Sequence, residues 1–228
     1  MKSNPIPYLS DYLSNPSIES LASIGGEVAQ LPQSWIQFLA LENNERITRV
    51  LAEWKKFGDC FYETIPKLEK NLVSVELLKN EGEYSLLYEI KGPKQPLYYE
   101  AKNSLKKQVN NNIESLWPGL PHSIRDFYEF HNGFFYLASH SLGPSPLEEV
   151  FLLSDEEWGI LESIPAPPVD LDKTIALFTN GMSGYVCLDM SKPDPENEAI
   201  IWWSNKAPKL DVKFWDIVDA WTAIGMDG

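Results

Sequence analysis

Residues 120–136, LPHSIRDFYEFHNGFFY, restrict the fold more than any other stretch, because they place a helix directly before a strand. Pro121 suits the first turn of a helix, where its missing N–H is not needed. Asn132-Gly133 can adopt the left-handed conformation that ends a helix, and aromatic residues typical of a strand come next. Between them, residues at helical spacing form one apolar stripe: Ile124, Phe127, Tyr128 and His131. The stretch predicts an α+β protein in which Pro121, Asn132 and Gly133 have structural roles.

The first half of the chain predicts an antiparallel meander of three strands. The runs of β-branched and aromatic residues are 72–78, 84–90 and 96–101, and short turn-rich segments separate them. An amphipathic helix is expected over residues 46–58. The opening 45 residues, rich in Asn, Ser and Pro, predict a loosely attached arm with one short helix. We interpret residues 1–100 as an N-terminal α/β extension packed on the core of a second domain.

Residues 101–228 predict that second domain, a mostly antiparallel sheet flanked by helices. Apolar spacing indicates a helix over residues 102–117, and a short acidic helix is expected over 155–165. The final helix is expected to begin with Asp211 as its cap. Three strand runs precede it, at 174–179, 184–190 and 199–205.

The composition is that of an ordinary globular protein, with 43% hydrophobic and 23% charged residues in 228. The first twenty residues contain neither a signal-peptide core nor an apolar run long enough for a transmembrane helix, so a cytoplasmic protein is expected. Cys60 and Cys187 have no metal-type or disulfide-framework spacing, and both are expected to be reduced.

The net charge of −14 lies mostly in the second half, because residues 119–228 hold 18 Asp and Glu but 6 Lys and Arg. Such a surface repels phosphate backbones and anionic lipid, which argues against nucleic acid or a membrane as the direct ligand. It favours a cationic partner. The alternative is that the carboxylates only keep the protein soluble.

The sequence offers little for catalysis. The three histidines, His122, His131 and His140, lack metal-ligand spacing, and no nucleotide-binding glycine motif occurs. Asp189, at the end of a predicted strand, is the best lone candidate for a catalytic carboxylate, but an Asp there usually bonds its own following backbone. We therefore expect a protein without catalytic residues, cofactor or metal.

The order of several short motifs resembles the SUKH superfamily, over residues 104–224. That superfamily includes the fungal Smi/Knr regulator of cell-wall assembly and many bacterial immunity proteins. The motif residues are Leu120-Pro121, Phe127, Asn132-Gly133, Pro146-Leu147, Gly184 to Asp189, Trp202 or Trp203, and Phe214. The resemblance implies a non-enzymatic SUKH-like α+β fold. In bacteria it implies a protein that binds and neutralises a cognate toxin, often a nuclease, and it gives Gly184 and Asp189 structural roles.

Charge and resemblance together predict a basic toxin as partner, since carboxylates complement a surface built to meet phosphates. Trp158 is expected to act as an aromatic anchor within the contact. The alternative is a regulatory or scaffold protein of the Smi/Knr type that binds cellular partners. The candidate partner-binding carboxylates are Glu148, Glu149, Asp155, Glu156, Glu157, Asp194, Glu196 and Glu198.

Overall fold

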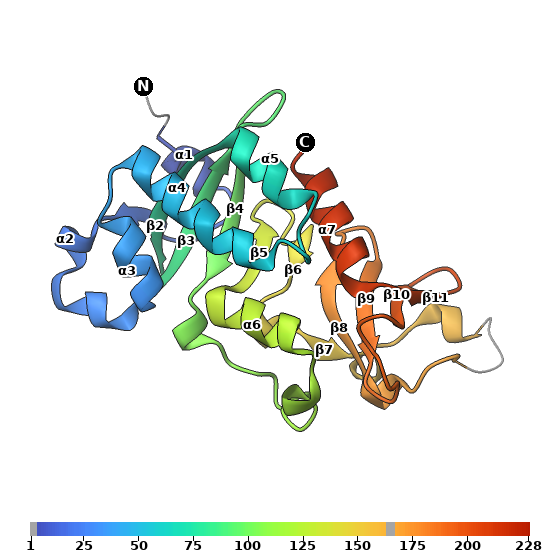
Figure 1. Ribbon diagram of the computed structural model, residues 1–228. Helices are drawn as coiled ribbons and strands as arrows, with labels where there is room; N and C mark the ends of the chain where they lie inside the picture. The colour runs from blue at the N-terminus through green and yellow to red at the C-terminus, as the bar shows by residue number, and fades with distance from the viewer. Residues whose placement is uncertain (1–3, 163–166) are drawn as a thin grey trace.

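The computed structural model describes residues 4–162 and 167–228 and contains two antiparallel sheets (Figure 1). The first has the strand order β1-β2-β3-β4-β5, and the second has the order β11-β10-β9-β8-β6, with β7 also paired to β8. The strands are β1 (Ser17–Glu19), β2 (Leu72–Asn80), β3 (Glu83–Ile90), β4 (Leu97–Lys102), β5 (Asn132–Tyr136), β6 (Gly143–Pro144), β7 (Phe151–Leu152), β8 (Thr174–Thr179), β9 (Gly184–Asp189), β10 (Ala199–Trp203) and β11 (Lys209–Val212). The expected α+β class with antiparallel strands is confirmed.

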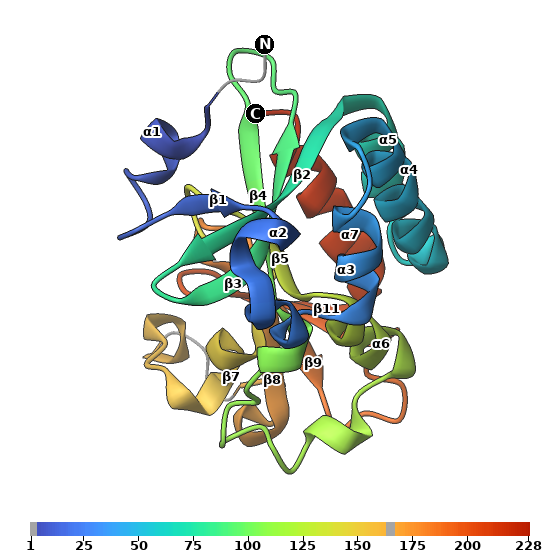
Figure 2. The same ribbon diagram turned by 90° about the vertical axis from the view of Figure 1, so that its left-hand side faces the viewer.

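Most of the helices pack on the apolar core that the two sheets share, whereas the first short helix lies on the outer face of the first sheet (Figures 1 and 2). α4 packs on β2, with α3 beside it, while α7 contacts α5, β6 and β9. The helices are α1 (Ile6–Leu9), α2 (Leu21–Ile24), α3 (Gln33–Leu39), α4 (Asn43–Trp54), α5 (Thr64–Asn71), α6 (His122–Phe130) and α7 (Phe214–Gly225). Short 3-10 turns lie at Gly25–Gln30, Lys55–Phe57, Ser104–Lys106, Trp117–Gly119, Leu147–Glu149, Leu153–Asp155, Gly159–Glu162 and Leu171–Lys173.

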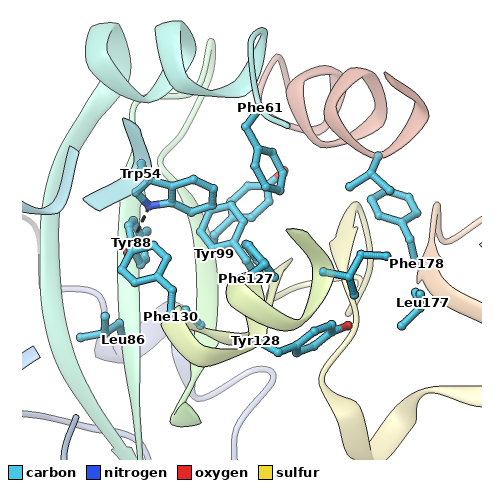
Figure 3. Close-up of a cluster of buried hydrophobic side chains, with 14 of the residues drawn as sticks. Trp54, Phe61, Leu86, Tyr88, Tyr99, Phe127, Tyr128, Phe130, Leu177 and Phe178 are labelled. Atoms are coloured by element: carbon cyan, nitrogen blue, oxygen red, sulfur yellow. Dashed lines mark hydrogen bonds between the residues drawn. The ribbon is translucent and has the colours of Figure 1, made fainter. Parts of the chain in front are cut away.

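One hydrophobic core runs from the first sheet into the second (Figure 3). At its centre the ring of Trp54 lies 4.8 Å from that of Phe134 and 5.2 Å from that of Phe61, measured between centroids. Trp54 also donates a hydrogen bond to the hydroxyl of Tyr88, 3.3 Å away. Phe178 of β8 belongs to the same core, so the helix-to-strand junction of α6 and β5 lies inside an interior that both sheets share.

The opening segment is not the loosely attached arm that its composition predicted. Trp35 and Phe38 of α3 are fully buried in the shared core, and β1 pairs with β2. Leu9 of α1 packs on the outer face of the first sheet. The polar composition was misleading because a few large apolar side chains bury enough surface to hold the whole segment against the core.

The expected boundary between residues 100 and 101 falls within β4. This strand continues the meander of the first half, yet its other edge pairs with β5, where Glu100 lies opposite Phe135 and Lys102 opposite Asn132. The segments before and after residue 100 therefore contribute to the same sheet.

The helix expected over residues 102–117 is wrong, because only a 3-10 turn at Ser104–Lys106 and turns after it form. Asparagine side chains satisfy the backbone locally instead. Asn103 accepts a hydrogen bond from the N–H of Leu105, and Asn110 accepts one from the N–H of Asn112. Such bonds compete with helix formation.

The acidic helix expected over residues 155–165 is also wrong within the described residues. The 3-10 turns at Leu153–Asp155 and Gly159–Glu162 replace it, and residues 163–165 lie outside the described part of the chain. The carboxylate of Asp155 accepts a hydrogen bond from the N–H of Leu152, which closes the first turn, and Gly159 disfavours a longer helix.

Near the C-terminal end the three strand runs form β8, β9 and β10 as expected. The sequence did not predict β11. Asp211 lies within this strand and has a φ of +53°. Asp211 is therefore not a helix cap, and α7 begins three residues later at Phe214. The apolar stripe of this helix is correct, since Phe214 and Val218 are buried.

Candidate functional site

The Asn132-Gly133 pair does not end α6 but begins β5, and it fixes the segment that carries Glu148. The side-chain oxygen of Asn132 accepts a hydrogen bond from the N–H of Leu147, and its amide nitrogen donates to Glu148, both at 2.9 Å. Gly133 has a φ of +83°, and a Cβ there would lie 2.6 Å from the backbone nitrogen of Pro146. The motif residues thus lock Pro146, Leu147 and Glu148 against β5.

Lys102 brings together the two carboxylates that the sequence identified. Its ammonium lies 3.0 Å from Glu148 and 3.6 Å from Glu149. His140 Nε2 lies within 2.7 Å of both carboxylate oxygens of Glu149. Burial acts to raise the pKa of Glu149, but the hydrogen bond and charge of His140, with the charge of Lys102, outweigh it and leave the pKa below its usual value. These two glutamates are therefore already paired within the protein.

A groove of about 480 Å³ lies beside this ion-pair network, between the β2–β3 turn, β4 and Glu148. Uncharged polar side chains, including Tyr84, Ser85 and Asn132, complete its lining. We call it the carboxylate groove, because acidic residues predominate among its charged residues, which are Glu81, Glu83, Glu100, Glu148, Lys102 and Lys106.

Glu100 is the buried member of the carboxylate groove, with 8% of its surface exposed. Burial raises the pKa of this carboxyl group, while a hydrogen bond from Ser85 and the positive charges of Lys102 and His140 act in the opposite direction. Glu100 is not among the site residues predicted from the sequence. The alternation of apolar and polar residues in YEAK, residues 99–102, was a usable signal, because it places Glu100 and Lys102 on the face opposite the buried Tyr99 and Ala101.

Asp155, Glu156 and Glu157 lie on the exposed connection after β7. Asp155 accepts a hydrogen bond from the side chain of Asn112 at 2.8 Å, in addition to its bond from Leu152. Glu156 and Glu157 are exposed. Of the three, these two present free carboxylates to solvent.

Trp158 is not an exposed anchor, contrary to our expectation. Its side chain is 7% exposed, its indole N–H donates to the carbonyl of Leu153 at 2.6 Å, and its ring lies 5.7 Å from that of Trp202. Trp158 belongs to a second apolar cluster that covers the outer face of the second sheet. The aromatic ring packs inward because that face would otherwise expose Cys187, Ile200 and Trp202 to water.

Asp194, Glu196 and Glu198 lie on the β9–β10 connection, next to α6 and α7. Ser123 of α6 donates a hydrogen bond to Glu196 at 2.5 Å, and the N–H of Phe214 donates to the carbonyl of Glu196. Asp194 is exposed, whereas Glu196 and Glu198 are half-buried. The sequence could not show that this loop turns toward the helices.

The other residues for which the sequence predicted structural roles act locally. Pro121 immediately precedes α6. A Cβ on Gly184 would lie 2.5 Å from the ring of Trp203. Asp189 is buried and accepts hydrogen bonds from the backbone N–H and the hydroxyl of Ser191, as expected for an Asp at the end of a strand.

Each of the three histidines has a different environment and a different partner. His131 is fully buried, with Nε2 2.7 Å from the hydroxyl of Tyr88, and burial lowers its pKa to about 3. His122 contacts Arg125, and His140 pairs with Glu149. In the described residues, no group of three or more His, Cys, Asp or Glu side chains is arranged to hold a metal ion.

No protein-family model, curated protein or solved structure matches the chain. None of the helices in residues 4–162 and 167–228 has the length and apolar character needed to cross a membrane.

Proposed function

We propose that this protein is a SUKH-like immunity protein that binds and neutralises a cognate bacterial toxin through its acidic surface. The observation that carries the proposal is the excess of 18 Asp and Glu over 6 Lys and Arg in residues 119–228. A nuclease-like toxin is basic where it meets phosphates, so an inhibitor that covers this region gains from carboxylates. The complementary charge also accelerates the encounter of the two proteins.

Exposed carboxylates without an internal ion pair support this proposal. Within the described part of the chain, no Lys, Arg or His side chain lies within 4.0 Å of Glu156, Glu157 or Asp194. Their charges are not neutralised by the protein itself, so they remain available to a basic partner.

A second candidate function is a regulatory or scaffold protein of the Smi/Knr type. The pairing of Glu148 and Glu149 with Lys102 and His140 favours this alternative. Carboxylates that are already neutralised within the protein suit contacts with several uncharged partners, and the remaining acidity then serves solubility.

The test is an affinity capture of the tagged protein from its native cells, at low salt and again at about 0.5 M salt, where the screening length is only a few ångströms. An immunity protein captures one dominant basic protein, and the capture weakens with salt. That protein should arrest growth when expressed alone and lose this effect when co-expressed with the proposed inhibitor. Several neutral partners would instead support the scaffold function.

A matched pair of variants separates acidity in the second half from total charge. Glu156→Gln with Glu157→Gln removes two exposed charges there, whereas Glu42→Gln with Glu45→Gln removes two exposed charges in the first half. We expect only the first pair to slow association with the captured partner. Equal effects would contradict a localised acidic contact.

A further inference from the structure

We propose that the carboxylate groove binds a guanidinium or ammonium group, seated against Glu100. The inference depends on the proposed function for the source of this group, a Lys or Arg side chain of the basic partner. The binding chemistry itself follows from the groove and applies equally to a free cationic small molecule.

The burial of Glu100 is the first argument. Its side chain lines the groove while 8% of its surface is exposed, and the hydroxyl of Ser85 donates a hydrogen bond to it. No cation among the described residues lies within ion-pair distance of this carboxylate. A buried carboxylate is costly unless it is paired, so Glu100 is an acceptor that a cation from outside would satisfy.

The position of Lys102 is the second argument. Lys102 follows Glu100 by two residues and lies on the same face of β4. Its ammonium nevertheless pairs with Glu148 at 3.0 Å and with Glu149 at 3.6 Å. Asn132 holds Glu148 in place from the other side. The network therefore keeps the nearest cation away from Glu100.

The composition and size of the groove are the third argument. Four glutamates and two lysines line a space of about 480 Å³, which leaves an excess of negative charge. A guanidinium group has several N–H donors in a planar fork and is weakly hydrated, so it can bond a carboxylate and neighbouring side-chain oxygens together. Arginine is thus the side chain that suits this groove best.

The ionisation of Glu100 agrees with this geometry. Burial raises the pKa of Glu100, with Glu149 acting in the same direction and Ser85, Lys102 and His140 acting against it. A cation beside Glu100 favours the ionised carboxylate and lowers that pKa, so binding releases a proton and strengthens as the pH rises.

The direct test uses agmatine, the decarboxylated form of arginine, titrated into the ¹⁵N-labelled protein. We expect saturable amide shifts at Ser85, Glu100 and Lys102. Glu100→Gln keeps the shape and the bond from Ser85, and should weaken binding roughly tenfold or more without lowering the melting temperature. Glu45→Gln, which removes an exposed carboxylate of α4, is the control and should bind agmatine like the parent.

A further variant excludes a merely structural effect. Lys102→Gln removes a positive charge from the groove and should tighten agmatine binding, whereas a structural defect would weaken it. An absence of saturable shifts, or equal affinities of the parent and Glu100→Gln for agmatine, would overturn the inference.

The captured partner provides the second arm of the test. Weaker binding of that partner to Glu100→Gln, with binding to Glu45→Gln unchanged, would identify a partner side chain as the occupant. Equal binding of the partner to both would overturn the partner side chain as occupant and leave the proposed function intact. Agmatine binding without any basic partner would support the cation site with a small-molecule source and contradict the proposed function.

Discussion

Asp219 of α7 caps the first turn of α5 at Thr64. Its carboxylate accepts hydrogen bonds from the backbone N–H of Thr64 at 2.8 Å and from that of Glu63 at 2.7 Å. The first N–H groups of a helix have no partner within it, and α5 has no side-chain cap of its own. A buried side chain from the other half of the chain supplies both the acceptor and a negative charge that complements the helix dipole.

Asp219→Ala should therefore destabilise the protein strongly. Two backbone N–H groups lose their acceptor, one of them buried, and each such loss costs about 1–3 kcal/mol. Urea unfolding measures the free energy change. Asp216→Ala removes an exposed carboxylate from the same helix and should change stability little. Similar losses in the two variants would show that the cap is unimportant.

Gly133→Val should destabilise the fold and displace Glu148. The φ of +83° disfavours a β-branched residue, and the new Cβ would meet the backbone of Pro146 at 2.6 Å. We expect a loss of about 2 kcal/mol or more in urea unfolding. Gly26→Ala is the control, because no atom of the described residues lies within 4 Å of a Cβ there and its φ is not positive. A Gly133→Val variant as stable as the parent would contradict this role.

Acid should weaken the fold partly through His131. Burial lowers its folded-state pKa from 6.5 to about 3, so its contribution to stability is present above the unfolded pKa and is lost as the pH falls toward about 3. The unfolded chain takes up a proton that the folded protein resists. His131→Gln should be less stable at about pH 7, but its deficit relative to the parent should shrink by about 2 kcal/mol at about pH 5. A deficit independent of pH would exclude this contribution.

Glu100 should show the opposite pH dependence. Its folded-state pKa is raised, so stability is greatest below the unfolded value of 4.5 and is lost as the pH rises through the folded value. Glu100→Gln removes this loss and should unfold at an equal or higher temperature than the parent near neutral pH. Calorimetry across this range should show the gain disappear below the unfolded pKa. A less stable variant at neutral pH would mean that Lys102 or His140 already compensates the charge.

The sequence was most informative where periodicity reflects burial. The meander of β2, β3 and β4 and the later strands β8, β9 and β10 were predicted because their apolar residues pack on the shared core. The prediction of a helix over residues 102–117 was wrong because apolar spacing does not take account of local side-chain hydrogen bonds. Asn103 and Asn110 accept such bonds from nearby backbone N–H groups.

The candidate site was predictable only in part. Glu148 and Glu149 were identified by charge, but their pairing with Lys102 and His140 depends on contacts between separate elements. Trp158 was expected to anchor the partner contact, because a sequence cannot show that this ring packs into the cluster on the outer face of the second sheet. The alternation in β4 contained the signal for Glu100, whereas the groove around it depends on the pairing of β4 with β5.

The contacts of α7 with α5, β6 and β9 have a consequence for biosynthesis. During translation the first sheet and α5 are made long before α7, so the side of the core that α7 covers stays open to water until this last helix emerges. The core of such a protein is fully covered only when α7 has been made. Until then the nascent chain exposes apolar surface, and intermediates of this type are prone to aggregate. The ribosome-bound chain should therefore become protease-resistant only after residues 214–225 have left the exit tunnel.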